Sequence, residues 1–162
     1  MDDQSFERLA AMLDYSMFVV TTEATGHRSG CLVGFATQTS LQPPRFLVGI
    51  SKRNHTFGVA ARSRHLAVHV LERRSLELAR LFGGQTGDDT DKFQHCSWHT
   101  GPAGMPILDD AAAWFVGKTL SRIELGDHLG YLLEPVAGHA SRPAGRLLAF
   151  SDVGDIEPGH DA

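Results

Sequence analysis

The part of the sequence richest in side chains that bind anions is the six-residue stretch SKRNHT. Its polar groups are two hydroxyls, an amide, an imidazole and two cations, supplied by Ser51, Lys52, Arg53, Asn54, His55 and Thr56. Charge-assisted hydrogen bonds from groups of these kinds commonly hold a phosphate. The chain elsewhere lacks the Gly-Lys-Ser/Thr ending of a P-loop. We therefore predict that this turn binds a phosphate.

Three further motifs contain residue types suited to chemistry. The segment from Gly30 to Pro44 reads GCLVGFATQTSLQPP, an apolar strand that runs into small polar residues and a double proline. The other two are Asp91-Lys92-Phe93 and Gly126-Asp127-His128. Each motif taken alone is typical of an ordinary strand, turn or solvated loop. Their order and spacing along one chain are more informative than any one of them.

In this order, the four motifs resemble the flavin reductase-like, FMN-binding split-barrel family. In that family a glycine-opened strand leads to Ser-x-x-Pro-Pro, then to a buried strand and a polar turn that ends in threonine. A later Gly-Asp-His precedes another apolar strand. The resemblance covers Met17 to Val136. It implies a Greek-key barrel that binds FMN or FAD, uses NADH or NADPH as hydride donor, and forms a homodimer because both subunits line the flavin cleft.

The resemblance places the flavin ring at the end of the strand that starts at Gly30. Such a ring is flat and forms hydrogen bonds along its edge, so backbone N–H groups of an irregular strand end suit it. We expect these groups from Gly34, Phe35, Ala36 and Thr37, and bonds to the ribityl and phosphate oxygens from Thr37, Gln38 and Ser40.

Two segments depart from the family pattern. Many members have a serine or asparagine pair before phenylalanine, whereas this chain has Gly34-Phe35-Ala36, so backbone groups must hold more of the flavin. Tyr15-Ser16-Met17 replaces a small residue followed by Gly-Val, a change that we interpret as structural.

The resemblance places His128 beside the flavin and the nicotinamide, and we assign it as the catalytic residue. Hydride transfer depends more on orientation than on proton abstraction, so His128 is expected to position the carboxamide or to stabilise charge on reduced flavin. Asp127 is expected to fix the turn or to orient His128. Phe93 is expected to lie over the nicotinamide or adenine, with a place in the core as the alternative.

A second group of candidate ligands is formed by His95, Cys96 and His99. Histidines four apart share one helical face, and cysteine is a good zinc ligand. A closed zinc site needs a fourth ligand, and no Cys-x-x-Cys motif accompanies these residues. We therefore assign no metal ligand. The two cysteines, Cys31 and Cys96, are expected to be reduced thiols because a lone pair in a cytosolic chain seldom forms a disulfide.

The elements that must position these residues are mostly strands. Patterns of β-branched and aromatic residues predict strands at 17–22, 30–37, 45–51 and 65–71, and a long hairpin of 112–125 and 129–139. Helical spacing predicts helices at 6–13, 56–62 and 75–82, the first of which should pack across a barrel end. The folded core should span residues 12–150, and the tail 151–162 should be disordered.

Composition limits the class of protein. The 162 residues, 42% hydrophobic and 21% charged, suit one domain spanning residues 1–162. Strands outnumber helices and no regular crossover helices separate them, so we predict an all-β antiparallel barrel with peripheral helices.

The net charge of −4 gives no general attraction to nucleic acid or to an anionic membrane, and no apolar run approaches a membrane span. The N-terminus lacks a secretory signal, so a cytoplasmic location is expected.

Together these inferences predict an NAD(P)H-dependent flavin reductase that transfers hydride to FMN or FAD. The resemblance also implies a partner monooxygenase that receives the reduced flavin. Two alternatives stay open: a barrel that stores flavin or haem without turnover, and an oxidoreductase that uses a deazaflavin. The sequence leaves open the choice between FMN and FAD, and between NADH and NADPH.

Overall fold

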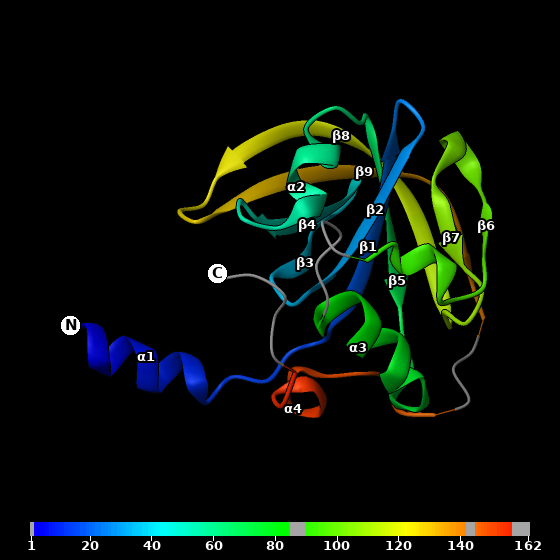
Figure 1. The fold of residues 1–162 in the computed structure, drawn as a ribbon. Helices are drawn as coiled ribbons and strands as arrows, with labels where there is room; N and C mark the ends of the chain where they lie inside the picture. The colour runs from blue at the N-terminus through cyan, green and yellow to red at the C-terminus, as the bar shows by residue number, and fades with distance from the viewer. Residues whose placement is uncertain (1, 85–89, 142–144, 157–162) are drawn as a thin grey trace.

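Only two residues, Gly34 and Phe35, connect the two edge strands of the main sheet in the computed structural model, which describes residues 2–84, 90–141 and 145–156. The strand order is β2-β1-β5-β8-β9-β4-β3, and every neighbouring pair is antiparallel. An extended residue spans at most about 3.6 Å, so this short connection forces the two edges close together. The sheet is accordingly strongly curved (Figure 1).

The strands of the main sheet are β1 (Phe18–Ala24), β2 (His27–Val33), β3 (Ala36–Leu41), β4 (Pro44–Ser51), β5 (His65–Val70), β8 (Ala113–Glu124) and β9 (His128–Ala140). A separate small sheet pairs β6 (Trp98–Thr100) with β7 (Pro106–Leu108). The helices are α1 (Asp3–Ala11), α2 (His55–Ala60), α3 (Leu76–Gly84) and α4 (Phe150–Val153), and 3₁₀ turns occur at Arg73–Ser75, Lys92–Gln94 and Pro102–Gly104. No helix in these described ranges is long and apolar enough to cross a membrane.

Local sequence explains how these elements begin and turn. Thr25 and Gly26 join β1 to β2, and both have positive φ, 50° and 79°, as a tight hairpin turn requires. Asn54 caps α2, because its side-chain oxygen accepts a hydrogen bond from the backbone N–H of Thr56 at 2.9 Å. Gly126, with φ of 99°, turns the chain from β8 into β9.

Two apolar clusters hold the helices against the sheet. One fills the curved sheet beneath α2 and includes Val20, Ile50 and Leu133. The other joins the sheet to α3 and α4 and includes Phe82 and Val153. Figure 1 shows α2 at one end of the curved sheet and α3 with α4 at the opposite end. The helices therefore cover different openings of the same sheet.

The predicted all-β character with peripheral helices is confirmed, whereas three details of the prediction are wrong. The strand expected at 30–37 breaks at Gly34, because the chain leaves β2 there and crosses to the opposite edge. Helix α1 does not pack across a barrel end: it has no buried residue, and Figure 1 shows it extending away from the sheet. The tail is not disordered from residue 151, because α4 spans Phe150–Val153 and Val153 is buried. Residues 157–162 lie outside the described residues.

Ion pairs fix the C-terminal segment. The Asp152 carboxylate contacts Arg73 at 3.1 Å and Arg146 at 2.8 Å, and it also accepts a hydrogen bond from the backbone N–H of Ala149 at 2.9 Å. Only 9% of this side chain is exposed. Hydrogen bonds from Arg146 and Ala149 lower the pKa of Asp152 to about 2. Residues far apart in the sequence are thereby held together beside α4.

This ion-pair network predicts a loss of stability in strong acid. Because the folded-state pKa lies below the ordinary value of 3.8, Asp152 stabilises the fold above pH 3.8, and this contribution disappears as the pH falls towards 2. Asp152→Asn should therefore flatten the decline in the free energy of unfolding across this pH range. Urea unfolding at several pH values measures it. Asp155→Asn, which breaks a surface pair with Arg80, is the control and should keep the decline. Equal slopes in both variants would contradict the prediction.

Candidate active site

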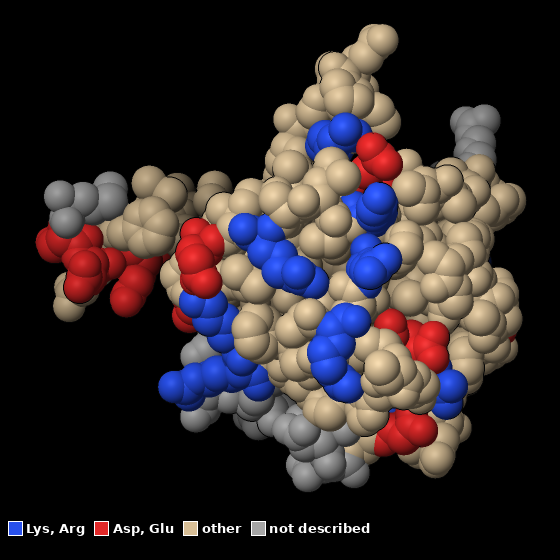
Figure 2. All heavy atoms as spheres, turned by 90° about the horizontal axis from the view of Figure 1, so that it is seen from above, with Lys and Arg blue, Asp and Glu red and all other residues tan. Residues whose placement is uncertain are grey.

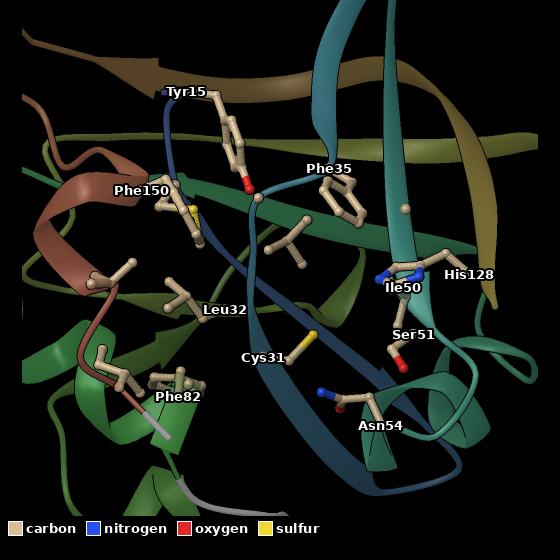
Figure 3. Close-up of a pocket in the computed structure, with 17 residues that line it drawn as sticks. Tyr15, Cys31, Leu32, Phe35, Ile50, Ser51, Asn54, Phe82, His128 and Phe150 are labelled. Carbon is tan, nitrogen blue, oxygen red and sulfur yellow. The ribbon is translucent and has the colours of Figure 1, made fainter. Parts of the chain in front are cut away.

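A pocket of about 290 Å³ opens where the crossover between β2 and β3 passes β4 and β9. Its walls come from β2, β4, the start of β9, α3 and the C-terminal segment, as Figure 3 shows. Five residues predicted from the sequence line it, namely Gly34, Phe35, Ser51, Asn54 and His128. The volume is close to the lower end of the range for small-molecule sites, so the pocket suits one ring system.

Four aromatic rings follow one another along this pocket. Phe150 stacks on Tyr15 with centroids 5.0 Å apart and an interplanar angle of 21°. Tyr15 lies 6.3 Å from Phe35, and Phe35 lies 5.0 Å from His128. Phe35 remains 59% exposed although it is a large apolar side chain. The row of rings offers a flat ligand an apolar surface that ends at an imidazole.

His128 stands at the first position of β9, where the turn after β8 directs it to the pocket. Its Nδ1 lies 2.7 Å from the Oδ1 of Asp127, and its side chain is 18% exposed. This hydrogen bond and the nearby imidazole lower the pKa of Asp127, so the carboxylate stays ionised and holds the ring. With Nδ1 engaged, Nε2 is the ring atom left for a ligand, since no hydrogen bond within the described ranges involves it.

The crossover places the backbone of Gly34 and Phe35 beside the pocket. The carbonyl of Phe35 accepts a hydrogen bond from the N–H of Gly49 at 2.7 Å, which fixes the crossover against β4. Within the part of the chain that the structure describes, no hydrogen bond uses the N–H of Gly34 or Phe35 as donor. Unpaired donors beside an apolar slot fit the edge and faces of a flat heteroaromatic ring.

The predicted phosphate turn is divided by the fold. Ser51 and Asn54 line the pocket, whereas the Thr56 side chain is buried and its hydroxyl lies 2.8 Å from that of Ser29. The Lys52 ammonium pairs with Glu124 at 2.5 Å. The Nε2 atom of His55 lies 3.0 Å from that of His27. Of this turn, only Ser51 and Asn54 therefore line the pocket.

Positive charge gathers on the face of the molecule that carries α2. Figure 2 shows several Lys and Arg side chains near the middle of this face, although the whole chain has a net charge of −4. Arg122 belongs to this region, since its guanidinium donates to the carbonyls of Ala60 and Ser63 at 3.3 and 3.2 Å. The positive electrostatic potential of these side chains attracts an anionic ligand to this end of the sheet.

The polar residues that follow the crossover lie outside the pocket. Ala36 begins β3, the edge strand, and the Thr37 and Gln38 side chains are exposed there. The Gln38 amide donates to the carbonyl of Ser40 at 3.1 Å, and the Thr37 hydroxyl donates to the carbonyl of Gln38 at 3.4 Å. The structure does not bring these four residues together with His128.

Phe93 lies in the core, with only 6% of its surface exposed. Its ring makes edge contacts with Phe82 and Trp98, at centroid distances of 5.6 and 5.5 Å. The preceding Lys92 is also buried, and its ammonium donates to the carbonyls of Gly30 and Phe82 at 3.2 and 2.9 Å. Burial lowers the pKa of Lys92. This motif ties α3 to β2 behind the pocket.

The candidate metal ligands point to other partners. Nδ1 of His99 lies 2.6 Å from the carboxylate of Asp109, and the Cys96 thiol donates to the carbonyl of Lys92 at 3.7 Å. His95 ends the 3₁₀ turn and is exposed. No group of three or more His, Cys, Asp or Glu side chains suited to a metal occurs within residues 2–84, 90–141 and 145–156.

Several pocket residues were missed by the sequence reasoning. Tyr15 and Met17 precede β1, Cys31 and Leu32 belong to β2, and Phe150, Val153 and Ile156 come from the C-terminal segment. Burial raises the pKa of the Cys31 thiol to about 11, so it is not a thiolate at neutral pH. The departure from the family pattern at Tyr15 was a usable signal, but we interpreted it as structural.

Comparison with known proteins identifies the family. The model of the flavin reductase like domain matches residues 11–155, and the chain belongs to this family. An FMN reductase (NADH) of Enterobacter cloacae is 27% identical over 153 residues, which cover 94% of this chain and 92% of the relative. The reductase component of a 4-hydroxyphenylacetate 3-monooxygenase of Klebsiella oxytoca is 33% identical, with 80% and 76% covered. The family resemblance seen in the sequence is confirmed.

The structural comparison agrees. An NADH:FAD oxidoreductase of Streptomyces globisporus superposes with a TM-score of 0.83 at 25% identity, covering 93% of this chain and 89% of that chain. A flavin reductase domain protein of an Arthrobacter species also gives a TM-score of 0.83 at 25% identity, with 92% and 91% covered. The fold and the sequence therefore lead to the same family.

Proposed function

We propose that the protein is an NAD(P)H-dependent flavin reductase that transfers hydride to FMN or FAD. The carrying observation is the pocket, in which unpaired backbone donors, a row of aromatic rings and His128 meet. Relatives named FMN reductase (NADH) and NADH:FAD oxidoreductase support this reaction for a chain of the same family. A role in flavin storage would not need a histidine held in place by a carboxylate.

Each part of the pocket has a role in this proposal. A bound flavin supplies the ring atom that accepts hydride from the nicotinamide. The N–H groups of Gly34 and Phe35 hold the edge of the ring, and Ser51 with Asn54 faces the ribityl and phosphate end. His128, oriented by Asp127, positions the nicotinamide or stabilises negative charge. Thr37, Gln38 and Ser40 remain proposed ligands for the outer part of the cofactor.

We also propose the finer architecture that the family implies. The close approach of the β2 and β3 edges supports a Greek-key split barrel. Helix α1 supports a homodimer, because apolar Phe6 and Leu9 are exposed on it. Met12 and Leu13, which directly follow the helix, are also exposed, Met12 to 83%. An unpartnered apolar helix face of this kind marks an interaction site. A second subunit that covers α1 would stabilise it.

One relative also indicates which kind of protein receives the reduced flavin. The Klebsiella relative is named as the reductase component of a monooxygenase. We infer that this protein likewise delivers reduced flavin to a partner monooxygenase, in the cytoplasm. Transfer of free reduced flavin requires that the flavin leave the pocket, and the exposed side of Phe35 is consistent with an open mouth.

Steady-state oxidation of NADH and NADPH tests the proposed function. The purified protein is mixed with each nucleotide in the presence of FMN, FAD, a deazaflavin or no flavin, and loss of nicotinamide absorbance is followed. We expect oxidation that depends on FMN or FAD. Turnover with the deazaflavin alone, or flavin binding without turnover of either nucleotide, would overturn the proposal in favour of the corresponding alternative.

A further inference from the structure

Tyr15 occupies the space that a side chain at position 34 would fill. A Cβ atom built on Gly34 would lie 2.6 Å from Cε2 of Tyr15 and 2.9 Å from the sulfur of Met17. Carbon atoms in contact lie about 3.5–4.0 Å apart, so a side chain at position 34 and the present Tyr15 ring exclude each other. The Tyr15 ring in its present place therefore requires glycine at position 34, so these two departures from the family pattern depend on each other.

The Tyr15 ring is held firmly in this place. Phe150 stacks on one side of it at 5.0 Å, and the backbone N–H of Phe150 donates to the carbonyl of Tyr15 at 2.8 Å. The residues next to them in the sequence are also joined: Ser151 donates to the carboxylate of Asp14 through its N–H at 3.0 Å and through its hydroxyl at 2.8 Å. The C-terminal segment therefore fixes the ring before any ligand arrives, and binding costs little side-chain entropy.

The Tyr15 hydroxyl faces the pocket without a partner. Figure 3 shows it directed to the side of the pocket where Phe35 lies. Across the described ranges no hydrogen bond involves this hydroxyl. Burial and the neighbouring Asp14 carboxylate raise the pKa of Tyr15, so the phenol is protonated at neutral pH. It is a fixed hydrogen-bond donor at the end of the pocket away from Ser51 and Asn54.

We propose that Tyr15 is a flavin-binding residue whose hydroxyl donates a hydrogen bond to a heteroatom on the edge of the ring and replaces a polar side chain at position 34. This inference rests on the proposed function, because it takes flavin as the ligand of the pocket. The ring of Tyr15 and its partner Phe150 provide the apolar surface, and the hydroxyl fixes the orientation of the ligand along that surface.

Titration of flavin fluorescence without nucleotide tests the hydroxyl. Tyr15→Phe keeps the ring and its stacking but removes the donor, so the Kd for flavin should rise about 5- to 10-fold, as expected for one hydrogen bond. Tyr131→Phe is the matched control, because this tyrosine lies in the core outside the pocket lining, and its Kd should stay at the wild-type value. A Kd for Tyr15→Phe equal to that of the wild type would overturn the inference.

A swap of the two positions tests their relation independently. Gly34→Ser alone should weaken flavin binding, because the new side chain collides with the Tyr15 ring. In a Tyr15→Ala background that ring is gone, and the flexible Met17 side chain, whose sulfur is the other close contact, can turn into the vacated space. The same Gly34→Ser change should then tighten binding by restoring a hydroxyl. If Gly34→Ser weakened binding equally in both backgrounds, position 34 and Tyr15 would not be alternatives and the inference would fail.

Different results would overturn the proposed flavin reductase function and the proposed role of Tyr15. A wild-type protein that binds neither FMN nor FAD would overturn the proposed function, and this inference with it. A wild-type protein that binds flavin but is indifferent to Tyr15→Phe would overturn this inference and leave the reductase proposal standing. Circular dichroism of each variant shows that a raised Kd does not come from unfolding.

Discussion

Replacing His128 with alanine is expected to lower kcat about 100-fold and to change the flavin Kd little. Misplacement of a reacting group by about 1 Å can cost this much in rate. In the structure the ring is fixed from two sides, by Asp127 at 2.7 Å and by Phe35 at a centroid distance of 5.0 Å. Alanine removes this fixed imidazole, while the backbone donors of Gly34 and Phe35 remain. Steady-state kinetics combined with flavin titration measure both quantities.

The control is His139→Ala, an exposed histidine on the same strand far from the pocket. It should leave kcat and the flavin Kd at wild-type values. If His128→Ala also kept the wild-type kcat, the assignment of His128 as the catalytic residue would be wrong. If it instead lost flavin binding with kcat intact, His128 would be a binding residue for flavin.

The second large effect concerns His69, a histidine outside the pocket. It is fully buried in β5, where Nδ1 donates to the carbonyl of Val19 at 2.9 Å and Nε2 accepts from the N–H of Leu108 at 3.1 Å. Both ring nitrogens are engaged by the neutral form, because Nε2 cannot accept a hydrogen bond once it carries a proton. Burial lowers the pKa of His69 to about 4.

This lowered pKa predicts that the folded protein loses stability at pH values above the interval in which Asp152 acts. Between pH 6.5 and pH 4 the unfolded chain binds a proton at His69 and the folded chain does not, so stability falls as the pH falls. The loss across this interval should reach about 3 kcal/mol, since one pKa unit corresponds to about 1.4 kcal/mol. Urea unfolding of the wild type and of His69→Gln between pH 7 and pH 4 measures it.

His69→Gln should be less stable at pH 7 but should show a flatter pH dependence. His95→Gln, at an exposed position, should keep the wild-type dependence and serves as the control. A steep acid loss that persists in His69→Gln would mean that other groups cause it. The two acid effects occupy separate intervals, so Asp152→Asn and His69→Gln can be told apart in one series of measurements.

Much of the sheet could be predicted from local patterns. The long β8–β9 hairpin occurs where the pattern of its residues predicts it, and the Thr25-Gly26 turn lies between two of the predicted strands. The Asn54 cap was not predicted, but it too depends only on neighbouring residues and on ordinary capping chemistry. The chemistry of the polar turn indicated Ser51 and Asn54, and the family resemblance added His128. The fold brings all three to one pocket. These residues stand at strand or helix ends, where local sequence determines position well.

The rest of the site depended on contacts between distant segments. The polar residues after Phe35 appeared to continue the strand, but the crossover carries them to the opposite edge, a step that alternation along a strand does not reveal. Tyr15 and Phe150 meet because hydrogen bonds between residues 14–17 and the C-terminal segment, among them Asp14 with Ser151, hold two distant parts of the chain together. For Phe93 the sequence left open a contact with the nicotinamide or adenine and a place in the core, and packing against Phe82 and Trp98 places it in the core.

Anaerobic reduction of bound flavin tests the central claim most directly. The purified protein is loaded with FMN or FAD, mixed without oxygen with NADH or NADPH, and the visible absorbance band of the flavin is followed. The account predicts that at least one nucleotide bleaches the band, and that His128→Ala bleaches it about 100-fold more slowly. A band that neither nucleotide bleaches, although dithionite does, would contradict the reductase function.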